Sequence, residues 1–118
     1  SRCTVAHGDF FQAVPSGDAY IMKHIIHDWD DAHAVRILKN IHTAAAPDAH
    51  LFLIESAMTT GNEPHFAKIV DLEMLLLPGG CERTELEYRD LLAQAGFKLT
   101  RVIKTKSPLD LIEAVRIN

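Results

Sequence analysis

The chain has 118 residues, 47% of them hydrophobic and 24% charged, with a formal net charge of −4 and an isoelectric point near 5.9. These values predict one soluble globular domain over residues 1–118, and the lack of a basic patch argues against nucleic acid as a partner. No apolar run reaches the roughly 18–20 residues of a membrane helix, and two cysteines, Cys3 and Cys81, are too few for a disulfide framework, which favours a cytoplasmic setting.

The first third of the chain predicts two strands. Residues 1–6 are expected to form a short strand, and the residues before 19 carry a Pro-Ser-Gly-Asp loop signal. Residues 19–26 form a second, largely apolar strand, broken by Lys23 and followed by a polar cluster that begins at His27. In open α/β sheets, ligands bind outside the carboxyl ends of such strands. The chemistry of the protein is therefore expected at His27.

A helix and a further strand should follow this polar cluster. Asp30 or Asp31 is expected to cap a helix whose apolar residues recur every three or four positions, until Pro47 stops it. Residues 50–57 form another apolar run, which reads as a buried strand with Glu55 at its end. The carboxyl ends of two parallel strands meet at one sheet edge, so Glu55 is expected near His27.

The rest of the chain is predicted to contain two helices and two strands, over residues 66–77, 84–96, 98–106 and 109–117. Thr84 and Glu87 have the spacing of a capping box, and Gly96 is suited to a left-handed helix end. Only Ser107 and Pro108 separate the last two strands, which predicts an antiparallel pair. Helices that alternate with strands in this way indicate an α/β layered domain.

Three polar residues are candidates for proton chemistry. An imidazole such as that of His27 titrates near neutral pH, and a carboxylate partner would fix its tautomer and stabilise its charged form. Glu55 at the next strand end and Glu82 in the following Gly-Gly-Cys-Glu-Arg-Thr turn are the two candidate partners. The alternative is that both acids are solvated loop residues paired with Arg83 or Lys68.

Metal and nucleotide binding have weaker signals. His24 and His27 are three residues apart, but on a strand end the two side chains should point apart, and the cysteines add no zinc spacing. No metal is therefore expected. Asp9 and Phe10 offer a hydrogen-bonding and a stacking group for a purine, although Gly-Asp is also an ordinary turn sequence. The single tryptophan, Trp29, is by type more often a core residue than a ligand contact.

Six short motifs, read in order, resemble one known family. They are Gly8-Asp9-Phe10-Phe11, Tyr20-Ile-Met-Lys23-His-Ile-Ile-His27-Asp28-Trp29, Leu53-Ile54-Glu55, Asp71-Leu-Glu-Met-Leu, Gly79-Gly80-Cys-Glu82-Arg83-Thr84 and Ala95-Gly96-Phe97. From residue 2 to residue 114 the chain resembles the carboxyl-terminal half of the S-adenosylmethionine-dependent small-molecule O-methyltransferases of the caffeic acid and hydroxyindole type. The resemblance implies a partial Rossmann-like (class I methyltransferase) mixed sheet with flanking helices.

The resemblance also implies a role for each matching residue. His27 would be the general base that deprotonates a small phenol-like hydroxyl, with Glu55 and Glu82 flanking it. Four residues would contact the cofactor, S-adenosylmethionine: Asp9 and Phe10 at its adenine end, with Lys23 and Trp29 also facing it. A sulfonium methyl is already activated, so the protein mainly aligns an oxygen and removes one proton, and no metal is needed.

The sequence departs from the family pattern at its amino-terminal side. None of the six glycines forms the G-x-G spacing of a cofactor loop, and the strands around that loop are absent. We therefore expect the isolated piece to be inactive or weak. The alternatives are a non-catalytic α/β binding or self-association module and, at a distance, a metal-dependent hydrolase. Beside Tyr20, Ile21 and Met22, the strand over residues 19–26 lacks the charges or prolines that usually blunt an edge, which predicts a homo-oligomer through this edge or through residues 1–11.

Overall fold

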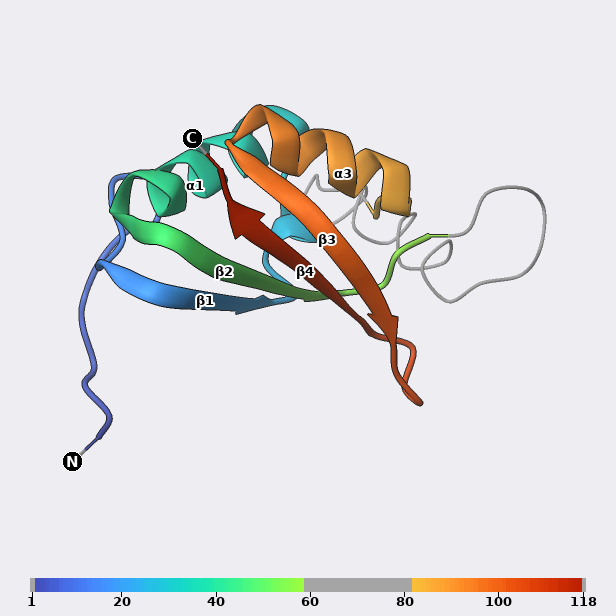
Figure 1. The fold of residues 1–118 in the computed structure, drawn as a ribbon, viewed down its shortest axis with the longest axis horizontal. Coiled ribbons are helices and arrows are strands. Elements are labelled where there is room, and N and C mark those ends of the chain that lie inside the picture. The colour runs from blue at the N-terminus through green and yellow to red at the C-terminus, as the bar shows by residue number, and fades with distance from the viewer. Residues whose placement is uncertain (1, 59–81, 118) are drawn as a thin grey trace.

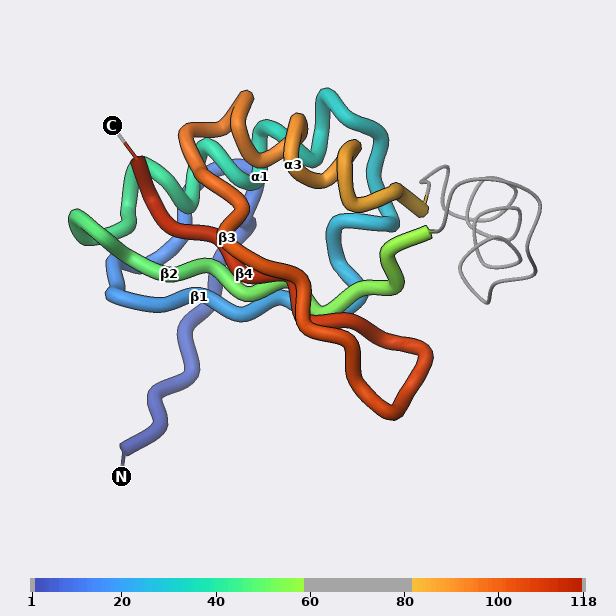
Figure 2. Tube along the Cα trace, turned by 45° about the vertical axis from the view of Figure 1, so that its right-hand side comes forward, coloured from blue at the N-terminus to red at the C-terminus, as the bar shows by residue number. Residues whose placement is uncertain are grey.

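The structure, a computed structural model, describes residues 2–58 and 82–117. Its described strands form one four-stranded sheet in the order β1-β2-β4-β3, and the two described α-helices lie together against one face of that sheet (Figures 1 and 2). The strands are β1 (Gly17–Lys23), β2 (Ala45–Glu55), β3 (Phe97–Lys104) and β4 (Asp110–Arg116), and the α-helices are α1 (Asp31–Ala44) and α3 (Glu85–Gln94). The predicted α/β architecture is confirmed.

The sheet is mixed, as predicted. β1 pairs with β2 in parallel through the α1 crossover, whereas β4 runs antiparallel to both β2 and β3. Within the described sheet β1 is therefore an edge strand whose one neighbour is β2, the position expected for residues 19–26. The parallel pairing also brings the carboxyl ends of β1 and β2 to the same edge, where Lys23 lies opposite Ile54.

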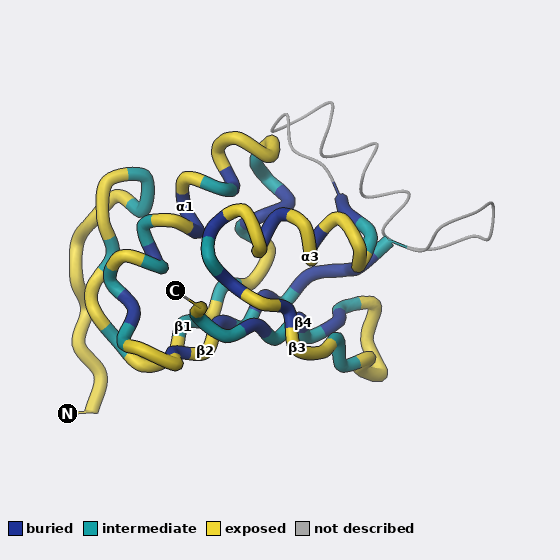
Figure 3. Tube along the Cα trace, turned by 45° about the horizontal axis from the view of Figure 1, so that its top comes forward, coloured by how far each residue is buried: buried dark blue, intermediate teal, exposed yellow. Residues whose placement is uncertain are grey.

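The core lies between the helices and one face of the sheet (Figure 3). Burial alternates along β2, where Leu51 and Leu53 are buried while Phe52 and Ile54 are only half-buried. This period of two is typical of a sheet with helices on one side. The helices contribute an apolar stripe each, namely Ala34, Ile37, Leu38 and Ile41 from α1 and Tyr88, Leu91 and Leu92 from α3.

The predicted starts of both described helices are confirmed by their hydrogen bonds, whereas α1 ends at Ala44 and not at Pro47, which lies in β2. The Asp30 side chain accepts a hydrogen bond of 2.9 Å from the His33 backbone N–H at the start of α1. Thr84 and Glu87 exchange both bonds of a capping box at the start of α3. After α3 the chain turns at Gly96, whose φ is +87°, and a Cβ at this position would lie only 2.6 Å from the His42 ring, which leaves no room for a side chain.

Three predicted boundaries differ from the structure. Residues 2–6 form no strand, and Val5 is 92% exposed, because they have no pairing partner within the described sheet. β1 ends at Lys23 because His24 turns the chain with a left-handed φ of 57°. β2 begins at Ala45, five residues earlier than predicted, because Ala45 pairs with Gly17. The predicted helix over residues 66–77 lies outside the described residues.

Neither described helix combines the length and the apolar character that crossing a bilayer requires.

Candidate active site

A tight turn at the end of β1 positions His27. The His24 N–H donates to the Ile54 carbonyl at 3.1 Å, which extends the parallel ladder by one step beyond Lys23. The left-handed His24 then reverses the chain, and Ile26–Asp28 forms a single turn of 3₁₀ helix. Ile26 is fully buried, and its N–H donates to Glu55 Oε2 at 3.0 Å. The end of β2 thus fastens the turn that carries the imidazole.

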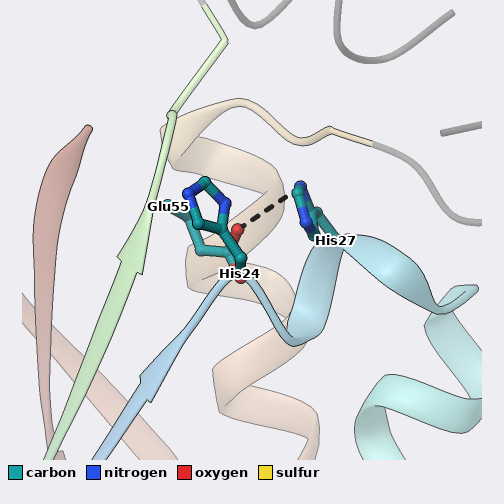
Figure 4. Close-up of side chains that lie close together, drawn as sticks. All are labelled: His24, His27 and Glu55. Atoms are coloured by element: carbon teal, nitrogen blue, oxygen red, sulfur yellow. Dashed lines mark ion pairs between the residues drawn. The ribbon is translucent and has the colours of Figure 1, made fainter. Parts of the chain in front are cut away.

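Three carboxylates surround the His27 ring, which is only 6% exposed. Nδ1 forms a hydrogen bond with Glu82 Oε1. Glu55 Oε1 lies 3.7 Å from the same nitrogen (Figure 4). On the other side of the ring, Nε2 lies 3.3 Å from Asp28 Oδ1. Because Glu82 holds the proton on Nδ1, the neutral ring keeps the lone pair of Nε2 as an acceptor.

The surroundings shift the pKa values of this group. Burial of His27 lowers its pKa, but the hydrogen bond to Glu82 and the charges of Glu55, Glu82 and Asp28 outweigh burial, so the pKa is raised above 6.5. Burial raises the pKa of Glu55 to about 7, against the opposing charge of His27. The pKa of His24 is lowered, first by burial and then by the charges of His27 and Lys23. The site is therefore set up for proton exchange near neutral pH.

A buried arginine holds the same turn from the opposite side. The guanidinium of Arg83, whose residue is 2% exposed, donates to the carbonyls of Ile26 at 3.2 Å and Trp29 at 2.9 Å. It also donates twice to Asp31 Oδ1, at 2.8 and 3.0 Å. Arg83 follows Glu82 directly in the sequence. One short segment therefore supplies both the hydrogen-bond partner of the His27 ring and the guanidinium that holds the turn carrying His27.

The structure brings together the three residues predicted for proton chemistry. Glu55 and Glu82 are both buried against His27, so they are not the solvated loop acids of the alternative interpretation. Arg83 bonds Asp31, and Lys68 lies outside the described residues. The expectation that His24 and His27 point apart was wrong, because the left-handed turn at His24 brings the two rings to a centroid distance of 5.0 Å.

The predicted cofactor residues lie on a more open surface. Asp9 and Phe10 line a hollow of about 520 Å³ formed by residues between 6 and 15. The Asp9 carboxylate accepts from the Phe11 N–H at 2.9 Å, so it also serves the ordinary turn that a Gly-Asp sequence favours. Trp29 is half-buried and stands edge-on to Phe11, with a centroid distance of 4.7 Å, while Lys23 is exposed at the end of β1.

Two structural residues of the site were missed by the sequence analysis. From the sequence, Arg83 was predicted only as a possible ion-pair partner of an acid. In the structure its backbone carbonyl accepts a hydrogen bond of 2.7 Å from the Met58 N–H, which joins the residues around Arg83 to those that follow β2. Asp110 accepts from the Ala57 N–H at 3.0 Å, which anchors the residues after Glu55 to β4. An aspartate near the start of the strand predicted over residues 109–117 was the one available signal.

Fold and site together define an α/β domain in which a buried histidine lies among carboxylates at the carboxyl ends of parallel strands. Residues 1–98 match the O-methyltransferase domain family, and the chain belongs to that family. The resemblance found in the sequence motifs is thereby confirmed.

Two similar proteins show how much of the family's length the chain covers. Phenazine O-methyltransferase PhzM of Lysobacter antibioticus is 44% identical over 114 residues, which cover 96% of this chain and 33% of that protein. The crystal structure of LaPhzM superposes with a TM-score of 0.94 and 44% identity, covering 98% of this chain and 35% of that one.

A third similar structure, human N-acetylserotonin methyltransferase in complex with SAM, has a TM-score of 0.89 and 32% identity. The match covers 96% of this chain and 33% of that one. The chain thus spans about a third of the length of the relatives it matches.

Proposed function

We propose that this chain is the carboxyl-terminal part of an S-adenosylmethionine-dependent O-methyltransferase and that His27 is its general base. The single observation that carries the proposal is the hydrogen bond between Nδ1 of the imidazole and the buried Glu82, an arrangement that would leave Nε2 to accept a proton. The acceptor that suits such a base is a small phenol-like hydroxyl, whose proton is the one obstacle to attack on an activated methyl group.

His27 would take the hydroxyl proton on Nε2 as the oxygen becomes nucleophilic. The resulting imidazolium would keep its Nδ1–H bond to Glu82 and gain attraction from Glu55, which lies 3.7 Å from Nδ1. Asp28 lies 3.3 Å from Nε2, so the hydroxyl would approach beside this carboxylate. Glu55 and Glu82 are therefore proposed to orient the base and to stabilise its protonated form.

The described residues fit one end of the cofactor. The hollow lined by Asp9 and Phe10 has the size of a small-ligand pocket, and the carboxylate and the ring suit an adenine. Trp29 and Lys23 would complete this side. When bound, S-adenosylmethionine supplies an electrophilic methyl group. Among the described glycines, a Cβ at Gly8 would meet no protein atom within 4 Å and one at Gly17 would make ordinary contacts. We propose that the isolated chain binds the cofactor weakly and is inactive or nearly so.

Substitution of the base in a complete enzyme that contains this chain tests the proposal. His27→Ala is expected to lower turnover by about 10²–10⁴-fold, the usual contribution of general-base catalysis, with little change in cofactor affinity. His33→Ala is the matched control, because His33 is exposed and bonds Asp30 outside the site. Equal losses of turnover and of S-adenosylmethionine binding, measured by titration calorimetry, would show that His27 has another role.

A second candidate function, self-association without catalysis, is favoured by the open edge of the sheet. Ile21 on β1 is 68% exposed, and within the described sheet β1 pairs on one side only. We propose that the isolated chain, in a cytoplasmic setting, forms a homo-oligomer through β1 or through residues 1–11. Sedimentation at low micromolar concentration tests this, and a folded 13.1 kDa monomer would contradict it.

A further inference from the structure

Three possible metal ligands from two strand ends converge at the site. One ligand atom from each of His24, His27 and Glu55 lies within 4.8 Å of the other two (Figure 4). The His24 N–H bond to the Ile54 carbonyl sets His24 beside Glu55, and the left-handed φ of His24 aims its ring toward His27. The backbone, rather than a chance rotamer, therefore creates the cluster.

Glu55 provides an independent sign that the cluster accommodates a ligand. Its side chain is 0% exposed, and Oε2 accepts the Ile26 N–H. Oε1 is also buried, but within the described part of the chain it accepts no hydrogen bond and lies 3.7 Å from His27 Nδ1. A buried carboxylate oxygen without a donor is costly, and a cation placed between it and the two imidazoles would satisfy it.

We propose that His24, His27 and Glu55 form a binding site for a divalent transition-metal ion of the Zn²⁺ type. Two imidazoles and one carboxylate are a set of three protein ligands that Zn²⁺ accepts with one position left open. Tetrahedral Zn²⁺ needs ligand atoms about 3.3 Å apart, so the three ligand atoms, which now lie within 4.8 Å of one another, would move closer together around the ion. Imidazole ligands disfavour Mg²⁺ and Ca²⁺, which prefer all-oxygen sites.

Metal binding here would be incompatible with the base role of His27, a consequence that rests on the proposed function. An ion on Nε2 occupies the lone pair that is to accept the hydroxyl proton. An ion on Nδ1 displaces the proton shared with Glu82 and leaves the ring's one proton on Nε2, so the acceptor is lost again. The ion would therefore act as a reversible inhibitor and not as a participant in methyl transfer.

Titration of the untagged 118-residue chain with Co²⁺ tests the site without any requirement for activity. Visible absorption reports the coordination of Co²⁺, and added Zn²⁺ should displace it with one ion bound per chain. His24→Asn is expected to weaken binding by about tenfold or more, equivalent to about 1.4 kcal/mol, because an amide replaces an imidazole while the left-handed backbone is tolerated. Glu55→Gln should weaken binding to a similar degree. His33→Ala and His50→Ala, at exposed histidines outside the cluster, should leave it unchanged.

The outcomes separate this proposal from the proposed function. Loss of binding in both cluster variants with retention in both controls supports the site. Equal binding in His24→Asn and the parent chain, or no stoichiometric ion in the parent, overturns it. In a complete enzyme, inhibition by Zn²⁺ that His24→Asn relieves supports the predicted conflict with the base. Binding by the chain without inhibition of the enzyme keeps the metal site and refutes the base role of His27.

Discussion

The turn that carries His27 and the segment over residues 2–16 are held in very different ways. The turn is fixed by Glu55 from the end of β2 and by Arg83 from the start of α3, both through buried side chains. The segment that carries Asp9 and Phe10 is mostly exposed and is tied to α1 by surface bonds, such as that from Asn40 Nδ2 to the Phe10 carbonyl at 2.9 Å.

This difference separates the two tasks of the proposed enzyme. His27, Glu55 and Glu82, the residues of the proposed proton transfer, are buried together and all lie among the described residues. Their geometry is therefore expected to persist in the isolated chain. The cofactor side is a more open surface, on which Phe10 and Phe11 are partly buried against the core. Substitutions in the turn should therefore change stability and proton affinity, whereas substitutions in residues 2–16 should change ligand binding while leaving stability nearly constant.

The largest effect is expected from the removal of the buried guanidinium. Arg83→Met would leave the carbonyls of Ile26 and Trp29 without this donor and open space in the core, at a cost of about 4 kcal/mol in the free energy of unfolding. Urea unfolding measures this cost. Arg101→Met is the matched control, since Arg101 pairs with Glu113 at the surface and should contribute less than about 1 kcal/mol. Similar losses of unfolding free energy in both variants would contradict the view that buried side chains hold the His27 turn more firmly than surface contacts could.

A smaller effect concerns the pH dependence of stability. The pKa of Glu55 is about 7 in the folded chain and 4.5 as the reference, so between these values the folded state holds a proton that the unfolded state releases. Stability must therefore fall as pH rises from about 4.5 to 7, by roughly 2–3 kcal/mol at about 1.4 kcal/mol per pKa unit. The raised pKa of His27 adds a further loss as pH rises above 6.5.

Glu55→Gln isolates the contribution of the carboxylate to this slope. The amide oxygen can still accept the Ile26 N–H, but the side chain no longer titrates. Denaturant midpoints measured from pH 5 to pH 8 should fall steeply in the parent chain and much less in the variant. Glu113→Gln, at a carboxylate bonded to Arg101 on the surface, should retain the parent slope. A flat profile in the parent chain would contradict the raised pKa of Glu55.

The smallest effect on stability is expected in the exposed segment. Phe10→Leu removes an aromatic ring that stands edge-on to Trp29 at 6.5 Å, and it should cost less than about 1 kcal/mol in unfolding. In a complete enzyme the same change should weaken S-adenosylmethionine binding by about tenfold, because adenine would lose its stacking surface. Calorimetric titration and urea unfolding of one variant compare the two effects directly. A large loss of stability with unchanged S-adenosylmethionine binding would show that Phe10 serves the fold and not the cofactor.

The parts of the fold that local patterns specify were predictable. The capping pair Thr84 and Glu87, the apolar stripe of α1 and the hairpin of β3 and β4 each depend on residues close in sequence. Residues 2–6 were wrongly predicted as a strand because a strand needs a partner that lies elsewhere in a sheet. The direction of the His24 side chain was wrongly predicted because no neighbouring residue indicates that this non-glycine residue adopts a left-handed backbone.

The site was predictable as a set of residues but not as an arrangement. Parallel strand ends placed Glu55 near His27 in advance, whereas the approach of Glu82 depends on the path of a turn. Arg83 was hard to foresee because arginine is rarely buried, and its partners here are mainly carbonyls and one exposed aspartate. Such long-range pairings leave no periodic trace in the sequence.

The strand order has a consequence for how the chain reaches its folded form. β1, α1 and β2 make contacts close in sequence, and so do α3, β3 and β4, but the two groups meet along the ladder between β2 and β4 and the contact of α1 with α3. Closing that seam joins residues about sixty positions apart, which is the slow kind of step in folding. The backbone pairing of Glu55 with Asp110 at the end of that seam would therefore form late, after β4 has left the ribosome.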